Sequence, residues 1–508
     1  MSEEFRIAQL LRDRATAHPG HVALVDGDGR AETYGELESR SNRLAQYLLA
    51  RGVGPGDRVA HLDRNSPAAA ELLFAAAKVG AVIVPLNWRL APPELAALVT
   101  DSRSRLLFCG SAFASLAATL APEPDAVIVL EGTEGWLDEQ PDEDPGRDGD
   151  FHAVVLQLYT SGTTGRPKGV QTTNRNLSNL TSGLGELWSV DESSVSLVAM
   201  PLFHIGGMGW LLVGLTNGAA NVLVPEIEPS ALLDTIEHER ITNAFLVPTV
   251  LQMLVAIPGA GQRDWSALRS IAYGASSITT TVLKTVAATF HCPLYQVYGM
   301  TETTGAIVQL AAEDHDPGGP REDLLRSAGR PYPWMELEIV DPDSGERMAP
   351  MKIGEVRVRG ASVTPGYFKN RAETEKALDA DGWLRTGDGG YLDEQGYLFL
   401  TDRIKDMIVT GAENVYPAEV EEVLARHPAV GEVAVFGVPD ERWGELVCAA
   451  VVSRSETDLV ALVAYARGQL AGYKLPRRVH FVKELPKTAT GKISKQDLRA
   501  RYGAVGGM

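Results

Sequence analysis

The sequence contains little cysteine: three residues in 508, at Cys109, Cys292 and Cys448, with no CxxC pair. This spacing excludes a disulfide framework and a zinc site built from cysteines, and it is typical of proteins of the reducing cytoplasm. No apolar run approaches the ~18 residues that a transmembrane helix needs. Residues 1–6 contain acids and lack the apolar segment of a secretory signal. We therefore expect a cytoplasmic protein without a transmembrane segment.

Basic residues are also scarce relative to acidic ones. Lys and Arg total 47 against 66 Asp and Glu, which gives a formal net charge of −19. Such a surface repels nucleic acid and, on average, anionic membranes, although peripheral membrane contact through a local patch stays open. A chain of 508 residues is too long for one hydrophobic core. We expect two or more domains of an ordinary globular composition.

Strand-like and helix-like patterns alternate in the first part of the chain. After a segment at residues 1–50 that we expect to be helical, strands are predicted at 59–62, 81–84 and 106–108, with helices at 68–79 and 92–99. This βαβ order predicts a parallel sheet that is covered on both faces. An acidic, proline-containing stretch at 138–146 is expected to be a solvated loop. Beyond it we predict strands at 154–158, 195–200, 222–224, 244–247, 271–273 and 294–297 and helices at 232–239 and 279–290.

The pattern changes to strand-rich from about residue 329, with expected strands at 336–340 and 354–359. A short α+β segment follows, with helices predicted at 418–426 and 458–470 and a strand at 433–436. We therefore predict an α/β protein. Its large N-terminal domain (1–402) would contain doubly wound α/β lobes and a β-rich subdomain, and its small, mobile C-terminal domain (403–508) would be α+β.

A polar motif at residues 159–170, with the sequence YTSGTTGRPKGV, follows the predicted strand at 154–158. Glycines allow backbone N–H groups to turn toward a ligand, hydroxyls add donors, and Lys168 brings a positive charge, as a polyphosphate requires. The motif is not a P-loop of NTPases, because Pro167 occupies the place of the second glycine. It is not a G-x-S-x-G nucleophile turn, because Tyr159 lies two residues before Ser161. The alternative is a flexible surface loop.

A second polar turn at 295–303 follows the predicted strand at 294–297, where an α/β sheet usually presents its ligand site. Tyr298 could stack on a purine ring, and the carboxylate of Glu302 is a hard oxygen ligand suited to Mg²⁺ that bridges phosphates. On these residues alone, an aromatic core residue next to a solvated acid is an equal alternative.

The motif at 159–170 resembles the phosphate loop of the adenylate-forming superfamily, which includes acyl-CoA synthetases, luciferases and the adenylation domains of peptide synthetases. The resemblance covers essentially the whole chain and is greatest to bacterial fatty-acyl-CoA and 4-coumarate-like ligases. It implies an enzyme that attacks the α-phosphate of ATP with a carboxylate, forms an acyl-adenylate and transfers the acyl group to coenzyme A.

The resemblance also assigns residues to the nucleotide. Without it, residues 274–276 and 386–388 would be read as ordinary turns. Asp388 resembles the residue that accepts the ribose hydroxyls, and Arg403 a second ribose or phosphate contact. The residues expected to bind ATP or AMP are Thr160, Ser161, Gly162, Thr163, Thr164, Gly165, Lys168, Gly274, Ala275, Ser276, Tyr298, Gly299, Thr301, Asp388 and Arg403.

Residues 402–417 resemble the hinge of acyl-CoA synthetases and the loop that follows it. Lys405 falls on the hinge position, about which the small domain rotates between the two half-reactions. Gly411 and Ala412 fall on the route of the thiol. Ala412 departs from the pattern, because relatives often have a second glycine there, and we expect the backbone of the route to lie slightly differently here. A simple linker is the alternative.

Lys492, in the stretch 485–495, resembles the catalytic lysine of the superfamily. By position alone, a lysine near a C-terminus is a solvated residue, and a solvated basic face stays open as an alternative. The surrounding segment is nonetheless basic within an acidic chain, as polyanionic substrates require. Its basic residues are Lys474, Arg477, Arg478, Lys483, Lys487, Lys492, Lys495, Arg499 and Arg501. The expected catalytic residues are Lys492, Glu302 (with Mg²⁺) and Lys168.

Residues 201–207 resemble the segment whose histidine or aromatic side chain gates the carboxylate side of the acid. We expect His204, Trp210 and Phe245 in the acyl pocket, with Met208 and Val247 as further wall residues. Apolar residues at such spacing are also typical of a plain core.

The sequence therefore predicts an ATP-dependent, AMP-forming acid–CoA ligase that uses ATP, Mg²⁺ and coenzyme A, most simply with a medium- or long-chain fatty acid. Three alternatives stay open: an aryl-acid ligase of the 4-coumarate or benzoate type, a stand-alone adenylation enzyme that loads a carrier protein, and a non-catalytic nucleotide sensor. No nucleic-acid partner is expected, and a homodimer stays open.

Overall fold

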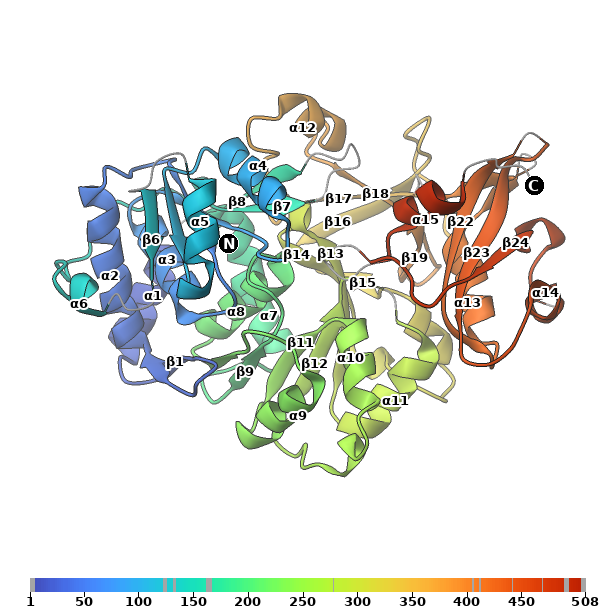
Figure 1. Cartoon of the computed structure of the whole chain (residues 1–508), viewed down its shortest axis with the longest axis horizontal. Helices are drawn as coiled ribbons and strands as arrows, with labels where there is room; N and C mark the ends of the chain where they lie inside the picture. Colours follow the sequence, from blue (N-terminus) through green and yellow to red (C-terminus); the bar gives the residue numbers. More distant parts are fainter. Residues whose placement is uncertain are drawn as a thin grey trace. The chain divides into compact units, whose positions relative to one another are not determined.

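We describe a computed structural model of the whole chain (Figure 1). The described residues are 5–121, 126–130, 134–160, 167–276, 278–403, 406–410, 413–440, 442–467, 469–487 and 493–503. The chain divides into two compact units, Met1–Glu336 with Arg359–Leu384, and Leu337–Val358 with Arg385–Met508. The expected domain boundary between residues 402 and 403 stays a prediction.

A six-stranded sheet in the first unit carries the strand that leads into the polar motif. Its order is β6-β5-β3-β4-β7-β8, and all neighbours are parallel except β7 and β8. The predicted βαβ order is confirmed here, with helices α3 (Pro67–Lys78) and α4 (Pro92–Ser102) between strands. The strands are β3 (Arg58–Leu62), β4 (Val82–Pro85), β5 (Leu106–Cys109), β6 (Val127–Val129), β7 (Val154–Thr160) and β8 (Lys168–Thr173). We did not predict β8.

A nine-stranded sheet forms the rest of the strand framework of this unit, in the order β15-β14-β13-β12-β11-β9-β10-β1-β2. The strands from β13 to β1 are parallel, and the antiparallel pairs lie at both edges. The strands are β1 (Val22–Val25), β2 (Ala31–Thr33), β9 (Val195–Val198), β10 (Ala220–Leu223), β11 (Asn243–Leu246), β12 (Ser270–Gly274), β13 (Leu294–Met300), β14 (Gly305–Leu310) and β15 (Arg330–Pro331).

The prediction that residues 1–50 are helical was partly wrong. Helices α1 (Ile7–Ala17) and α2 (Tyr34–Ala50) are present, but β1 and β2 lie between them because β1 gains hydrogen bonds from the distant strand β10. The helices predicted at 232–239 and 279–290 are confirmed, and Figure 1 shows α9, α10 and α11 beside β11 and β12. The remaining helices of this unit are α5 (Ala114–Leu120), α6 (Glu134–Asp138), α7 (Asn174–Leu187), α8 (Ile205–Thr216), α9 (Pro229–His238), α10 (Pro248–Val255), α11 (Thr280–Phe290) and α12 (Arg371–Ala377).

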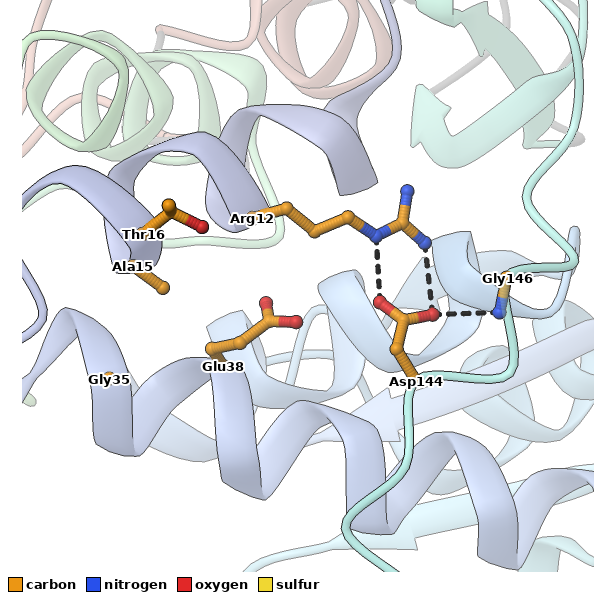
Figure 2. A pocket seen from close by; sticks show the side chains of 7 residues that line it. All are labelled: Arg12, Ala15, Thr16, Gly35, Glu38, Asp144 and Gly146. Atoms are coloured by element: carbon orange, nitrogen blue, oxygen red, sulfur yellow. Dashed lines mark hydrogen bonds and ion pairs between the residues drawn. The ribbon is translucent and has the colours of Figure 1, made fainter.

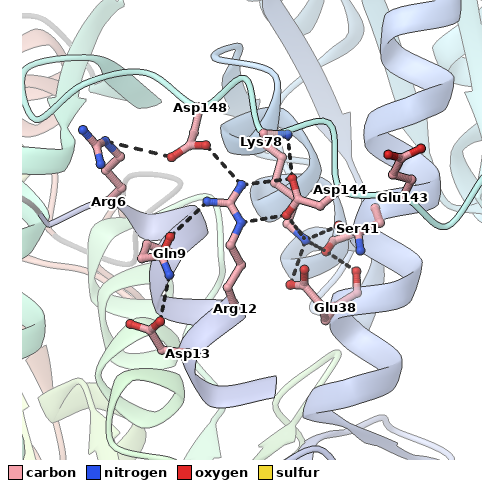
Figure 3. A network of polar contacts seen from close by, with 12 residues as sticks. Arg6, Gln9, Arg12, Asp13, Glu38, Ser41, Lys78, Glu143, Asp144 and Asp148 are labelled. Carbon is pink, nitrogen blue, oxygen red and sulfur yellow. Dashed lines mark hydrogen bonds and ion pairs between the residues drawn. The ribbon is translucent and has the colours of Figure 1, made fainter. Parts of the chain in front are cut away.

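A buried lysine organises the N-terminal region of the first unit (Figure 3). The Lys78 side chain is fully buried, and its Nζ lies 2.7 Å from Glu38 and 3.7 Å from Asp144. Arg12 also donates to Asp144, at 2.7 Å. Burial lowers the pKa of Lys78, and the ion pair with Glu38 opposes this shift. The stretch 138–146 is largely exposed, as predicted. Within it, Asp144 contacts Arg12 of α1 and Lys78 of α3.

A cavity of about 610 Å³ opens beside this network (Figure 2). Its lining includes Arg12, Glu38 and Asp144, all of which are already engaged in the charged contacts described above. No described residue that we predicted to bind nucleotide or acid is among the residues that line it.

The second unit holds most of a four-stranded sheet in the order β16-β17-β18-β19, followed by a sheet formed by β20 to β24. The strands are β16 (Met335–Val340), β17 (Gly354–Gly360), β18 (Leu384–Leu392), β19 (Leu398–Arg403), β20 (Ile408–Thr410), β21 (Glu413–Val415), β22 (Val430–Asp440), β23 (Gly444–Ser453) and β24 (Arg478–Phe481). Its helices are α13 (Pro417–Ala425), α14 (Leu459–Arg467) and α15 (Lys495–Tyr502).

The β22–β23 hairpin is buried on both faces. Alternate residues belong to two separate cores, because successive side chains of a strand point to opposite faces. Val435 packs in one core with Leu424 of α13, and Phe436 packs in the other with Leu498 of α15. Leu485, which follows β24, and Leu498 of α15 both belong to the second core.

Candidate functional site

The two ends of the polar motif lie on the neighbouring antiparallel strands β7 and β8. Thr160 ends β7 and pairs in register with Lys168, which begins β8. Ser161, Gly162, Thr163, Thr164 and Gly165 lie outside the described residues. Because a strand rather than a helix follows the motif, a polyphosphate here would gain no helix dipole. Lys168 brings a positive charge to the start of β8.

Lys168 is held between two side chains of the segment that follows β17. Its ammonium forms an ion pair with Glu373 of α12 and lies 4.9 Å from the ring centre of Tyr367. The Lys168 side chain is only 12% exposed and that of Glu373 17% exposed. Hydrogen bonds from Lys168 and from Lys376 lower the pKa of Glu373 to about 2, so this carboxylate is charged at neutral pH.

Backbone pairing fixes this arrangement. Phe368 N–H donates to the carbonyl of Gly169 at 2.8 Å, and Gln171 N–H donates to the carbonyl of Gly366 at 3.2 Å. The segment around Tyr367 therefore runs along the open edge of β8. This pairing brings a residue of α12 into contact with a lysine 205 positions earlier in the chain.

Glu302 contacts the hydroxyl of Tyr367. It sits in the 3₁₀ turn η4 (Thr301–Thr303), where it is 6% exposed, and its Oε1 accepts a hydrogen bond of 3.0 Å from the Tyr367 hydroxyl. The Glu302 carbonyl accepts from Thr364 N–H at 2.8 Å. Tyr367 thus contacts both Lys168 and Glu302, which we predicted as site residues from two separate motifs.

The Glu302 carboxylate fits a magnesium ion in its chemistry. It is a buried hard oxygen donor with one oxygen oriented by a hydroxyl, and buried carboxylates require a cation or hydrogen bonds. Among the described residues there is no group of three or more His, Cys, Asp or Glu side chains that could hold a metal. One carboxylate together with substrate phosphates is the usual way in which a protein holds Mg²⁺.

The predicted adenine-contacting residues lie on two neighbouring parallel strand ends. Gly274 pairs with Val297, so Ala275 and Ser276 leave β12 beside the place where Tyr298 and Gly299 continue β13. Neither Gly274 nor Gly299 has space for a side chain. A Cβ at Gly274 would lie 2.2 Å from the Val297 carbonyl oxygen.

At Gly299 a Cβ would lie 1.8 Å from the Gly305 carbonyl oxygen. Ala275 has φ +68°, an uncommon value for a residue with a side chain. Ala275 and Ser276 are exposed, while Tyr298 and Thr301 are half-buried. The structure therefore groups these predicted residues at the carboxyl ends of the neighbouring strands β12 and β13.

Asp388 and Arg403 occur together in the second unit. They are opposite each other in the β18–β19 pair, and the Asp388 N–H donates a hydrogen bond of 3.1 Å to Oγ1 of Thr386. The preceding Gly387 has φ +71°, which favours glycine, and its N–H donates to Glu355 at 3.2 Å. Burial is the main cause that raises the pKa of Glu355.

The predicted acyl-pocket residues lie around the start of α8. His204 is the residue before α8, and a Cβ at Gly206 would be 3.0 Å from the Phe245 ring. The ring centre of Trp210 lies 6.2 Å from that of Phe245 and 5.4 Å from that of Trp188. Trp210 is 4% exposed, and its buried indole N–H has no hydrogen-bond partner within the described part of the chain.

Four predicted site residues besides the motif lie outside the described residues: Lys405, Gly411, Ala412 and Lys492. Their roles stay predictions. Sequence reasoning missed Tyr367, Glu373 and Trp188. Tyr367 lies 65 positions from Glu302, and no spacing within its own stretch indicates a ligand. The aromatic character of Trp188 was visible, but its contact with Trp210 depends on the packing of α7 against α8.

No helix in the described part of the chain is both long and apolar enough to cross a membrane. Two family models match the sequence. The AMP-binding enzyme model matches residues 11–368, and the AMP-binding enzyme C-terminal domain model matches residues 419–492.

Individual proteins are similar along nearly the whole chain. A fatty acid–[acyl-carrier-protein] ligase of Streptomyces coeruleorubidus is 39% identical over 94% of this chain and 92% of its own. A feruloyl-CoA synthase of an Amycolatopsis species is 40% identical over 96% and 98%. The solved o-succinylbenzoate CoA synthetase of Bacillus subtilis, in complex with its acyl-adenylate intermediate, has a TM-score of 0.85 and 32% identity over 96% and 97% of the two chains. The chain therefore belongs to the AMP-binding enzyme family, the adenylate-forming superfamily that includes the AMP-forming acid–CoA ligases.

Proposed function

We propose that this protein is an ATP-dependent, AMP-forming acid–CoA ligase of the cytoplasm. It activates a carboxylic acid as an acyl-adenylate and transfers the acyl group to coenzyme A. The observation that carries the proposal is the Lys168–Tyr367–Glu302 array, which joins a cation beside the phosphate motif to a buried carboxylate. A non-catalytic nucleotide sensor would also need a cation at the phosphates, but it would not need Lys492, which resembles the superfamily's catalytic lysine, in addition to Lys168 and Glu302.

The first step joins two anions, the carboxylate of the acid and the α-phosphate of ATP. At ~4 Å and an effective dielectric of ~20, their repulsion is roughly 4 kcal/mol. A positioned cation that cancels most of it accelerates the reaction by about three orders of magnitude. We assign this role to Lys492, and we assign to Lys168 the binding of the phosphates that leave as pyrophosphate.

Glu302 is the residue that would hold Mg²⁺, with Tyr367 orienting one of its oxygens. When bound, the ion supplies positive charge to the phosphate oxygens as pyrophosphate leaves. Tyr298 and the turn at 274–276 provide a surface for the adenine, and Asp388 with Arg403 binds the ribose. Rotation about Lys405 then removes Lys492, and the thiol enters past Gly411 and Ala412.

We propose a medium- or long-chain fatty acid as the substrate, in keeping with the fatty-acid ligase relative. An aryl acid is the second candidate. The aromatic cluster of Trp188, Trp210 and Phe245 favours a ring, and the buried indole N–H of Trp210 could donate to an oxygen substituent on it. The feruloyl-CoA synthase relative supports the same candidate.

A panel of acids tests these proposals. Purified protein is incubated with ATP, Mg²⁺, coenzyme A and each acid, and AMP and the thioester are quantified by chromatography. Equal amounts of both products with fatty acids support the proposal, and a preference for oxygenated aryl acids selects the second candidate. Acyl-AMP that forms but reacts only with a carrier protein would instead identify a carrier-loading enzyme. The absence of both acyl-AMP and AMP with every acid would contradict all three.

A further inference from the structure

The ammonium of Lys168 forms an ion pair with Glu373, and under the proposed function the same ammonium binds the phosphates of ATP. In the structure this ammonium already has an anionic partner, and both side chains are largely shielded from water. ATP must therefore replace a carboxylate on Lys168, or bind beside it against its negative charge.

If Lys168 leaves Glu373, the Glu373 carboxylate still has another cation beside it. Its second oxygen, Oε1, lies 2.6 Å from Nζ of Lys376, whose side chain is 71% exposed. Its own backbone N–H donates to the side chain of Asn370 at 3.3 Å, so the start of α12 is capped independently of Lys168. The carboxylate thus keeps a cation and the helix keeps its cap when Lys168 turns away.

The ring of Tyr367 contacts the Lys168 ammonium, and this contact does not depend on whether Glu373 or a phosphate is the anionic partner. The ammonium lies against the ring, where the electrons of the aromatic face attract a cation, and the hydroxyl of the same ring donates to Glu302. Exchange from Glu373 to a phosphate therefore needs only a change at the free end of the lysine, while the ring stays bonded to Glu302.

We propose that Glu373 is a positioning residue that competes with the triphosphate of ATP for Lys168. It holds the lysine in place before the nucleotide binds, and it lowers the affinity for ATP as a consequence. This inference rests on the proposed function, since it requires that Lys168 binds phosphate.

Glu373→Gln tests the competition directly. Binding of ATP with Mg²⁺ is measured by isothermal titration calorimetry, without any carboxylic acid, so that no turnover occurs. The dissociation constant is expected to fall by at least about three- to fivefold, because even a solvent-exposed ion pair contributes up to about 1 kcal/mol and this pair is more shielded. The matched control is Glu375→Gln, which removes the same charge from an exposed position of α12 that pairs with Arg371 at 2.6 Å. It is expected to change the constant less than twofold.

A double-mutant cycle separates competition from a general charge effect. In a Lys168→Gln background, Glu373→Gln should no longer tighten ATP binding, whereas a general loss of repulsion would persist. Weaker or unchanged binding by Glu373→Gln, or an equal effect of Glu375→Gln, would overturn the inference. If Glu373→Gln does not fold, Glu373→Asp gives the same test, with a smaller gain in affinity expected. A parent protein that binds no ATP would contradict the proposed function instead.

Discussion

Replacing Tyr367 with phenylalanine would remove one oxygen atom from the centre of the candidate site and leave the ring in place. The lost contact is a hydrogen bond of 3.0 Å from the tyrosine hydroxyl to a carboxylate oxygen of Glu302, which is buried. Hydrogen bonds to charged groups contribute about 1.5–3 kcal/mol. The ring contact with Lys168 at 4.9 Å does not involve the hydroxyl and is expected to persist.

The effect should appear in metal binding as well as in stability. Residues that orient a metal ligand typically contribute 10–100-fold to metal affinity, and we expect the lower end, about tenfold, since Mg²⁺ is also held by the phosphates. The free energy of unfolding should fall by about 1.5–3 kcal/mol. Mn²⁺ binding in the presence of ATP, followed by electron paramagnetic resonance, measures the first quantity, and urea denaturation measures the second.

Tyr34→Phe is the matched control, because the Tyr34 hydroxyl is also buried but donates to the backbone carbonyls of Leu215 and Ala219, at 3.2 and 3.0 Å. It should reduce stability by about 0.5–1.5 kcal/mol and leave metal affinity unchanged. If Tyr367→Phe lost stability while its Mn²⁺ affinity stayed within twofold of the parent, the hydroxyl would be a structural contact and its assigned role in orienting Glu302 would be wrong.

Three further predictions follow from the sequence and the structure. Lys492→Ala should abolish acyl-AMP formation yet largely spare thioester formation from supplied acyl-AMP, and equal loss of both would contradict its role. Lys405→Pro should slow thioester formation more than adenylation, because proline restricts φ at the hinge; unchanged thioester rates would remove Lys405 from the hinge. Burial and the neighbouring Glu71 raise the pKa of Glu32 to about 8 from an ordinary 4.5, so folding stability should fall as pH rises from about 4.5 to about 8. Glu32→Gln should reduce this slope in thermal melts, and an unchanged slope would show that Glu32 is not its source.

The strand framework was predictable where short apolar runs alternate with helical periodicity. The elements from β3 to β5 are confirmed because both the apolar runs and the helices between them are strongly patterned. Strand β8 was missed because Lys168–Thr173 is mostly polar and follows a proline, so only its hydrogen bonds to β7 reveal a strand. Strands β1 and β2 were missed because they are short and pair with residues far away in sequence.

The candidate site was predictable only where a motif is contiguous. Lys168 and Glu302 were selected from separate stretches, each from its own chemistry. Tyr367 and Glu373, which connect and engage them, were not, because their contacts form across 65 and 205 residues of chain. A single sequence carries no local signal for such contacts, since they depend on the segment after β17 pairing with the edge of β8.

The central claim is that this chain joins an acid to the adenylyl group of ATP before any thiol takes part. ATP–pyrophosphate exchange with radiolabelled pyrophosphate, measured with Mg²⁺ and an acid but without coenzyme A, tests it most directly. The claim predicts exchange that requires both the acid and Mg²⁺, together with acyl-AMP detectable by mass spectrometry. Exchange that is absent with every acid, or that proceeds equally well without one, would contradict it.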